Sequence, residues 1–310
     1  MTTCTSQRAP FAVHTGGAAE KPSGNSVDWR ALLSHASIEV LPEQATTFAP
    51  AANAFAPGAY VFLPHIAGHS LDVRVVAAKH LIARGLHPVV HLSARNFPSI
   101  AEFEGHIRDL DRAGVKCCLA IGGVPSITPN PVLATATDMI ESSAFRAASF
   151  ETVFVAGHPE GIAGVADQEL WAALGEKLSL LRSQNRRTEI VTQFAFDGVA
   201  MARWANLLRC QEINVPLRFG VAGVTSLPKL IKFAVLCGVG PSLSILKRQA
   251  GSIFKVMRDQ DPREIIEALS NGLAQNGHAN THIHFFPFGG WEKTATWMSL
   301  NAHAGRACAD

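Results

Sequence analysis

Short β-rich runs alternate with helical segments along most of this 310-residue chain, and this alternation restricts its fold more than any other feature. Each β-rich run is flanked by Gly, Pro or polar residues, as is typical of strands that end in loops. Between two of these runs, residues 71–84 carry apolar side chains at helical spacing and stop at Gly85. The pattern predicts strands at residues 37–41, 59–64, 87–93, 115–121, 152–156, 189–195, 216–221 and 283–286.

Helical segments fill the intervals between these strands, so the strands are expected to run parallel. The predicted helices cover residues 71–84, 99–113, 133–146, 166–184, 198–211 and 226–237. Strands and helices in this alternation indicate an α/β protein built as a single (β/α)8 TIM barrel, rather than an open doubly wound sheet. Functional residues of such a barrel lie at the carboxyl ends of its strands.

The barrel is expected to occupy residues 28–305. Residues 1–27 are rich in Thr, Ser, Gly, Ala and Pro and predict a loose N-terminal arm. Residues 240–275 predict two or three helical pieces, an insertion longer than a usual crossover. After the last strand, Gly289 and Gly290 predict a turn that leads into a final helix beginning at Trp291.

The composition favours chemistry on small molecules. The formal net charge is +2 with both signs interspersed, so no basic stripe suggests nucleic acid or an anionic membrane as partner. No apolar run reaches the roughly 18 residues of a membrane span, and no signal-peptide pattern opens the chain. Cys117 and Cys118 lie in an apolar run without a C-x-x-C pair, which predicts buried free thiols. We therefore expect a cytoplasmic protein.

Known nucleotide fingerprints are missing from the sequence. The Gly122-Gly123 pair after the fourth strand does not extend to G-x-G-x-x-G at the start of a helix, and no P-loop occurs. Dinucleotide or ATP domains of those two kinds are therefore not expected.

Three polar residues at strand ends are candidates for chemistry. Glu39 on the first strand would be partly desolvated in the barrel mouth, which would raise its pKa towards neutrality and suit a proton donor. The Gln193 amide can donate and accept hydrogen bonds at the same time, as binding to the edge of a heterocycle requires. His158 follows a strand where phosphate or ribose oxygens could bind. Each also has a structural interpretation: a solvated or salt-bridged carboxylate, an amide that binds loop backbone, and a histidine that fixes its loop.

Four histidines raise a metal hypothesis. His282 and His284 alternate on one strand, and His65 and His69 are separated by one helical turn. Neutral imidazoles on one face suit zinc or iron. However, the first strand lacks the His-x-His pair that metal-dependent barrel hydrolases use. A metal-dependent barrel hydrolase is therefore the last of the three functions that we consider for this chain.

Six segments together resemble the methylenetetrahydrofolate reductase family in order and spacing over roughly residues 35 to 300. They are Ser37-Ile-Glu-Val-Leu-Pro42, Pro88-Val-Val-His-Leu-Ser93, Ala156-Gly-His-Pro-Glu-Gly161, Ile190-Val-Thr-Gln-Phe-Ala-Phe-Asp197, Gly220-Val-Ala-Gly223 and His284-Phe-Phe-Pro-Phe288.

The resemblance implies an oxidoreductase that passes a hydride from NADH or NADPH through FAD to 5,10-methylenetetrahydrofolate, giving 5-methyltetrahydrofolate. Glu39 then matches the general acid, and Gln193 the glutamine that contacts folate and nicotinamide in turn. The resemblance also implies a flavin site and a substrate site. The flavin-site residues are His91, Gly122, Gly123, His158, Asp167 and Lys177, and the substrate-site residues are Gln193, Leu227 and Phe286. With Phe286 as a wall of the folate site, His282 and His284 are expected to orient backbone rather than bind metal.

Two departures keep an alternative open. Gly122-Gly123-Val124 replaces the family's Arg-Gly-Asp, and Pro64 with His65 replaces its Thr-Tyr. Without the carboxylate beside the flavin, the chain could be a flavin-free folate-binding protein or a direct NAD(P)H-dependent reductase of the same fold. The resemblance places the chain in one-carbon metabolism and methionine biosynthesis, or in the reverse oxidation of methyl-folate. The sequence leaves the oligomeric state open, a homo-oligomer included.

Overall fold

The strands close into a parallel barrel. The structure, a computed structural model, describes residues 28–66, 68–123, 131–236, 259–273 and 280–302. Around the barrel the order is β1-β10-β7-β6-β5-β4-β3-β2, and each neighbouring pair is parallel. The strands are β1 (Ser37–Glu39), β2 (Tyr60–Leu63), β3 (His87–Ser93), β4 (Cys117–Ile121), β5 (Thr152–Gly157), β6 (Arg187–Phe194), β7 (Leu217–Ala222) and β10 (Thr281–Phe286). This confirms the predicted (β/α)8 barrel, with strand ends displaced by one or two residues at most.

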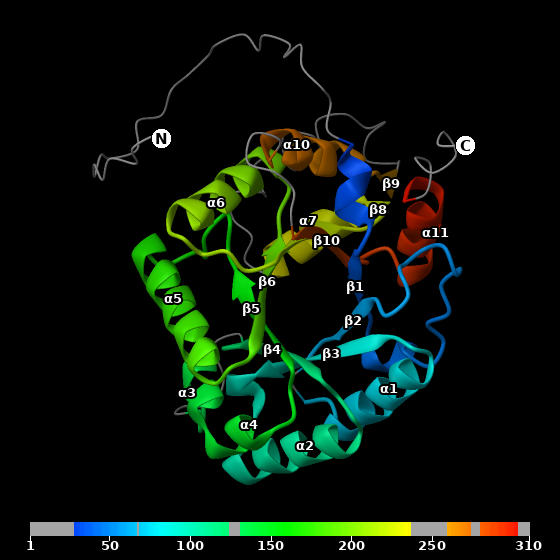
Figure 1. The fold of residues 1–310 in the computed structure, drawn as a ribbon. Coiled ribbons are helices and arrows are strands. Elements are labelled where there is room, and N and C mark those ends of the chain that lie inside the picture. The colour runs from blue at the N-terminus through cyan, green and yellow to red at the C-terminus, as the bar shows by residue number, and fades with distance from the viewer. Residues whose placement is uncertain (1–27, 67, 124–130, 237–258, 274–279, 303–310) are drawn as a thin grey trace.

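Helices surround the barrel, as Figure 1 shows in a view along its axis. They are α1 (Leu71–Ala83), α2 (Ile100–Arg112), α3 (Ala136–Glu141), α4 (Ser143–Ala147), α5 (Asp167–Ser183), α6 (Gly198–Cys210), α7 (Leu227–Leu236), α10 (Arg263–Leu273) and α11 (Trp291–Asn301). Side chains of Ser70, Ser99 and Asp197 accept hydrogen bonds from first-turn N–H groups of α1, α2 and α6. These caps satisfy donors that a helix start leaves free.

One predicted helix is broken in two. Residues 133–146 form α3 and α4, because Ser142 between them has extended backbone (φ −59°, ψ 148°). The Ser142 hydroxyl accepts a hydrogen bond from the N–H of Phe145 and so caps α4. A serine favours such a cap over a mid-helix position.

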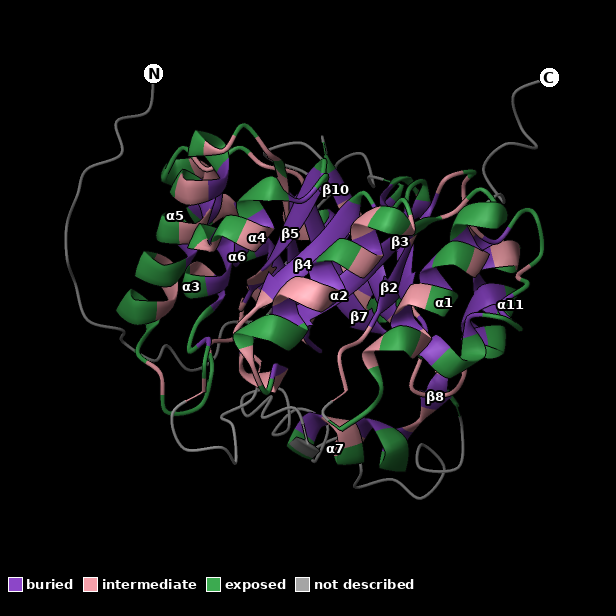
Figure 2. Cartoon of the chain, turned by 90° about the horizontal axis from the view of Figure 1, so that it is seen from below, coloured by how far each residue is buried: buried purple, intermediate pink, exposed green. Residues whose placement is uncertain are grey.

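The strands are buried on both sides. Figure 2 shows purple strands enclosed by helices whose outer surfaces are green. Cys117 packs inside the barrel with Phe62 and Phe154, whereas Cys118 packs in the layer between strands and helices. Both cysteines are buried free thiols, as predicted, and Cys210 on α6 is exposed. None of the helices in the described ranges combines the length and hydropathy that a membrane crossing requires.

A buried ion pair fills the amino-terminal end of the barrel. Arg218 on β7 donates from Nε to Oε2 of Glu189 at 2.8 Å and from Nη1 to the carbonyl of His35 at 2.7 Å. Its guanidinium also lies over the ring of Tyr60 at 4.7 Å. This layer is fully partnered and lies opposite the functional end, so we interpret it as structural.

Additional elements lie beyond the carboxyl end of the barrel. There α7 follows β7, and the two-residue strands β8 (Thr225–Ser226) and β9 (Asp259–Gln260) pair antiparallel, which the sequence did not predict. Within the predicted insertion, α10 is confirmed, and residues 240–258 lie outside the described residues. The predicted arm at 1–27 and the end of the barrel at 303–305 lie outside them as well.

A close approach of α6 and α10 gives a test of the packing. A Cβ atom at Gly198 would clash with the carbonyl oxygen of Ile265 and lie 2.6 Å from the backbone N of Leu269. Because both neighbours are helix backbone, Gly198→Ala should lower the free energy of unfolding by about 1–3 kcal/mol. Urea denaturation measures this change.

The matched control is Gly175 on α5, where an added Cβ meets nothing within 4 Å. Gly175→Ala should raise the stability by about 0.5–1 kcal/mol, since Ala loses less conformational freedom in a helix. Equal stability of both variants would contradict the α6–α10 packing.

Candidate functional site

Glu39 ends β1 at the mouth of the barrel. Its side chain is 22% exposed, and burial raises its pKa to about 7. This is the direction that the sequence predicts for Glu39. A carboxylic acid in this state keeps its proton up to neutral pH and can donate it.

His91 on β3 faces this carboxyl group. Its Nε2 lies 3.8 Å from Oε2 of Glu39 and has no hydrogen-bond partner among the described residues. Burial, with the positive charge of Arg74 as a second cause, lowers the pKa of His91 to about 3. The imidazole is therefore neutral while Glu39 holds its proton.

A second histidine completes this side of the barrel interior. Nδ1 of His284 on β10 lies 3.0 Å from Oγ of Ser37, two residues before Glu39. The ring of Phe62 lies 4.3 Å from that of His284 and 5.8 Å from that of His91. Burial lowers the pKa of His284 well below its usual range. Glu39 thus lies among neutral and aromatic side chains, which accounts for its raised pKa.

Gln193 lies in an irregularity of β6. The register with β7 shifts between Val191 and Phe194, and such a bulge redirects the side chains within it. The hydroxyl of Thr192 accepts the N–H of Gly220 at 2.9 Å and so replaces a backbone partner. The side-chain oxygen of Gln193 accepts the N–H of Phe194 at 3.1 Å. Both proposed catalytic side chains therefore lie at the carboxyl end of the barrel.

Aromatic side chains cover the mouth beside Gln193. The ring of Phe286 lies against Gly220, where an added Cβ would be 2.7 Å from it, and 5.4 Å from the ring of Phe194. Phe288 stacks on Phe233 of α7 at 4.2 Å. Phe286 is half-buried at this mouth, whereas Leu227 is fully buried in the same apolar cluster. Contact of Phe286 and Leu227 with substrate stays a prediction.

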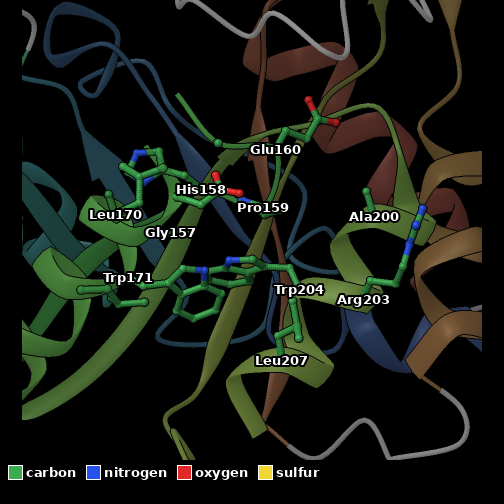
Figure 3. Close-up of a pocket in the computed structure, with 14 residues that line it drawn as sticks. Gly157, His158, Pro159, Glu160, Leu170, Trp171, Ala200, Arg203, Trp204 and Leu207 are labelled. Carbon is green, nitrogen blue, oxygen red and sulfur yellow. The ribbon is translucent and has the colours of Figure 1, made fainter. Parts of the chain in front are cut away.

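A cavity of about 360 Å³ opens between α5 and α6, next to the end of β5. Figure 3 shows Trp171 and Trp204 reaching towards each other from the two helices, and their rings are stacked at 5.8 Å. The lining residues are Ala156, Gly157, His158, Pro159, Glu160, Gly161, Asp167, Leu170, Trp171, Leu174, Ala200, Arg203, Trp204 and Leu207. The cavity thus combines flat apolar walls with a few charged groups.

Two of the predicted flavin-site residues lie in this cavity. His158 follows β5, and Asp167 begins α5 beside Gly161, whose backbone has φ +74°. Burial, with the charge of Lys177 as a second cause, lowers the pKa of His158 to about 4. Lys177 is itself buried enough for its pKa to be lowered, but it is not among the lining residues. Its contact with a cofactor stays a prediction.

The loop after β4 receives an arginine from the neighbouring strand. Arg95, just after β3, donates from Nη1 to the carbonyl of Gly123 at 2.8 Å. An added Cβ at Gly122 would lie 3.4 Å from the same Nη1 atom. Gly123 has φ +78°, a conformation that favours glycine. The two glycines therefore leave room for a guanidinium at the end of β4.

The four histidines of the metal hypothesis have separate partners. His65 accepts the N–H of Ser93, and His69 pairs with Glu43 at 3.0 Å. His282 packs on the ring of His35 at the amino-terminal end, whereas His284 lies beside Ser37. Among the described residues, no three His, Cys, Asp or Glu side chains group around a common point. A metal site made from these four histidines is therefore not supported.

Several site residues escaped the sequence analysis. Arg74, Arg95, Trp171 and Trp204 come from helices or from a loop beyond a strand. The signal that could have found the tryptophans is their position on helices that follow consecutive strands, within the first two turns of each helix.

Fold and strand-end residues define a (β/α)8 barrel with a buried acid at its mouth and a cavity beside it. The model of the family described as Methylenetetrahydrofolate reductase matches residues 65–264. The chain belongs to the methylenetetrahydrofolate reductase family.

One solved structure supports the fold. It is described as "Uncharacterized protein from Clostridium thermocellum binds two copies of 5-methyl-5,6,7,8-tetrahydrofolic acid". The similarity has a TM-score of 0.51 and 10% identity, and covers 89% of this chain and 95% of that chain. At this identity the similarity shows a shared fold alone.

The raised pKa of Glu39 predicts a pH-dependent gain in stability from Glu39→Gln. Between pH 4.5 and about 7, the unfolded state releases the Glu39 proton while the folded state keeps it, so folding is progressively disfavoured. Glutamine removes this cost. The difference in Tm between Glu39→Gln and wild type should be small at pH 4, rise up to pH 7 and then level off.

Glu43→Gln is the control, because hydrogen bonding lowers the pKa of exposed Glu43. Its effect on Tm should be small and opposite in sign. A Glu39→Gln difference in Tm that is independent of pH would contradict the raised pKa.

Proposed function

We propose that this chain is a folate-metabolising oxidoreductase that interconverts 5,10-methylenetetrahydrofolate and 5-methyltetrahydrofolate, with NADH or NADPH as co-substrate and FAD as cofactor. One observation carries the proposal: in a chain of this family, a partly buried carboxyl group whose pKa is raised to about 7 lies at the barrel mouth. The similar Clostridium thermocellum structure, whose title names a methylated folate, supports the substrate class.

Glu39 supplies the proton that this reaction needs. The bridging methylene of the folate accepts a hydride poorly until its five-membered ring opens, and opening requires a proton on the leaving nitrogen. Protonated Glu39 donates to that nitrogen and becomes a carboxylate. In the reverse direction the carboxylate takes the proton back, so the same group serves both directions.

Gln193 and Phe286 orient the substrates. Gln193 lies in the β6 bulge at the mouth, and its amide, whose oxygen accepts the N–H of Phe194, would hydrogen-bond the edge of a pterin or of a nicotinamide. Phe286 offers an aromatic face on the neighbouring side, close to Phe194. If folate and nicotinamide bind alternately at this position, Gln193 and Phe286 each contact both substrates within one catalytic cycle.

The cavity between α5 and α6 fits the nucleotide half of FAD. Trp171 and Trp204 offer flat apolar surfaces for an adenine, and the Asp167 carboxylate can accept hydrogen bonds from ribose hydroxyls. His158 and Arg203 provide nitrogen donors along the same cavity. When bound, FAD carries the hydride between the two substrates.

Arg95 partly replaces the arginine that this chain lacks in the loop after β4. The arginine of the family's Arg-Gly-Asp is missing, but the Arg95 guanidinium lies beside Gly122 and donates to Gly123. A cation is therefore still present at the end of β4. The carboxylate position is Val124, which lies outside the described residues.

A flavin-free activity is the second candidate, and the Gly122-Gly123-Val124 sequence motivates it. In that case the chain binds folate alone or transfers hydride directly from NAD(P)H. For either candidate we place the protein in the cytoplasm and in one-carbon metabolism, where it supplies methyl groups for methionine biosynthesis or oxidises methyl-folate.

FAD binding separates the two candidates. The purified chain, or the chain incubated with FAD, should show a flavin absorption spectrum, and Asp167→Asn should weaken FAD binding about tenfold, since a hydrogen bond to a charged group is lost. Titration of the apoprotein with FAD, followed by flavin fluorescence, measures the affinity.

Glu169→Gln is the matched control, because Glu169 is an exposed acid on the same helix turn outside the cavity. It should leave the affinity unchanged. A colourless protein that does not bind added FAD would favour the flavin-free candidate.

Glu39→Gln separates the two half reactions. Reduction of the flavin by NAD(P)H should stay near the wild-type rate, whereas reduction of the folate should slow by about 10²–10⁴-fold, because only the second half reaction needs the proton. Stopped-flow absorbance of the flavin measures each half reaction. Equal losses in both would show that Glu39 holds the cofactor or the fold instead.

A further inference from the structure

Arg74 is a buried cation that lacks a counter-ion. It lies in the first turn of α1 and is 2% exposed. Its Nη1 donates to the backbone carbonyl of His91 at 2.6 Å, whereas its Nη2 has no hydrogen-bond partner among the described residues. No carboxylate in the described part of the chain forms an ion pair with it. An unpaired buried charge lowers stability, so its presence here needs a functional reason.

Three histidines lie around Arg74, and Glu43 lines the small pocket beside it, with its carboxylate 3.0 Å from Nδ1 of His69. His65 follows β2 and His106 lies on α2, and burial followed by the charge of Arg74 lowers their pKa values to about 2 and about 3. His91 lies between this cluster and the barrel interior, where it faces Glu39 of β1 and His284 of β10. At neutral pH these three histidines are therefore uncharged and Arg74 carries the positive charge of the cluster, while the exposed Glu43 carboxylate at its edge pairs with His69.

Glu39 and His91 can share one proton in two arrangements. Either the carboxylic acid faces a neutral imidazole, or a carboxylate faces an imidazolium, across the 3.8 Å between Oε2 and Nε2. Burial by itself favours the neutral arrangement, because each ion would lose its hydration. Here the imidazolium would lie next to the Arg74 charge, with its own backbone carbonyl already bound to that guanidinium.

We propose that Arg74 is a positioning residue for the general acid: its buried charge behind His91 biases the shared proton towards Glu39. The bond to the His91 carbonyl holds the strand and the charge together. The inference rests on the proposed role of Glu39 as proton donor. It adds that a residue on the outer side of the barrel wall keeps the shared proton off His91.

The arrangement also acts after the proton has left. When the leaving nitrogen of the folate takes the Glu39 proton, the carboxylate remains opposite His91. Because Arg74 disfavours an imidazolium there, His91 does not neutralise the new carboxylate, and the next proton from solvent returns to Glu39. The acid is thereby restored for another turnover.

NMR titration of the free, full-length protein tests this inference without substrate. Samples carry ¹³C in glutamate carboxyl groups and histidine rings, and Glu39→Gln and His91→Asn identify the two signals. Between pH 4 and 9, wild-type Glu39 should titrate near pH 7 while His91 stays neutral. In Arg74→Met, the proton affinity of His91 should rise at least tenfold, so that its transition moves up by one pH unit or more and enters this range.

Arg74→Lys is the matched control, because it keeps the charge. His91 should stay neutral in this variant, which a purely structural role of Arg74 would not predict. If Arg74→Met does not fold, Arg74→Gln, which keeps a donor for the His91 carbonyl, takes its place. A His91 that stays neutral in the uncharged variant would overturn the inference, as would equal protonation in Arg74→Lys. Both outcomes are independent of whether the protein reduces folate.

Discussion

Closure of the barrel through β1 is the constraint on which the site depends. This strand has three residues, yet it pairs with β10 on one side and with β2 on the other. Ser37 and Ile38 align with His284 and Phe285, and the contact between Ser37 Oγ and His284 Nδ1 reinforces this register. A register shift of one residue would turn Glu39 away from the interior. The buried surroundings that raise the Glu39 pKa therefore follow directly from this pairing.

The strands and most helices could be predicted because their signals are local. Apolar runs between Gly, Pro and polar residues define each barrel strand, and helical periodicity defines α1. The break at Ser142 was missed, since a capping side chain there outweighs the propensity of its neighbours. The β8–β9 pair was missed for another reason: it joins Thr225 to Gln260 through two residues each, which leaves no periodic pattern.

The residues of the candidate site also fall into those whose positions could be predicted from the sequence and those whose positions could not. The positions of Glu39, Gln193 and His158 at the barrel mouth could be predicted, because the carboxyl ends of parallel strands meet at one face. Trp171 and Trp204 could not, because two apolar helix residues line a cavity only if their helices face each other. Lys177 does not line the cavity beside Asp167, and its contact with a cofactor, which the family resemblance implies, stays a prediction.

Two buried arginines, one at each end of the barrel, differ in how their charges are compensated. Arg218, at the amino-terminal end, has a carboxylate, a carbonyl and an aromatic ring as partners, so its charge is compensated. Arg74, near the carboxyl end, has a carbonyl and neutral imidazoles. This fold pairs one buried guanidinium with a carboxylate, and an Asp or Glu beside Arg74 could do the same. Such a carboxylate would also cancel the field at His91, and the proton on Glu39 would lose its bias. The uncompensated charge is therefore the feature to expect if the carboxyl end of the barrel is organised around a protonated Glu39.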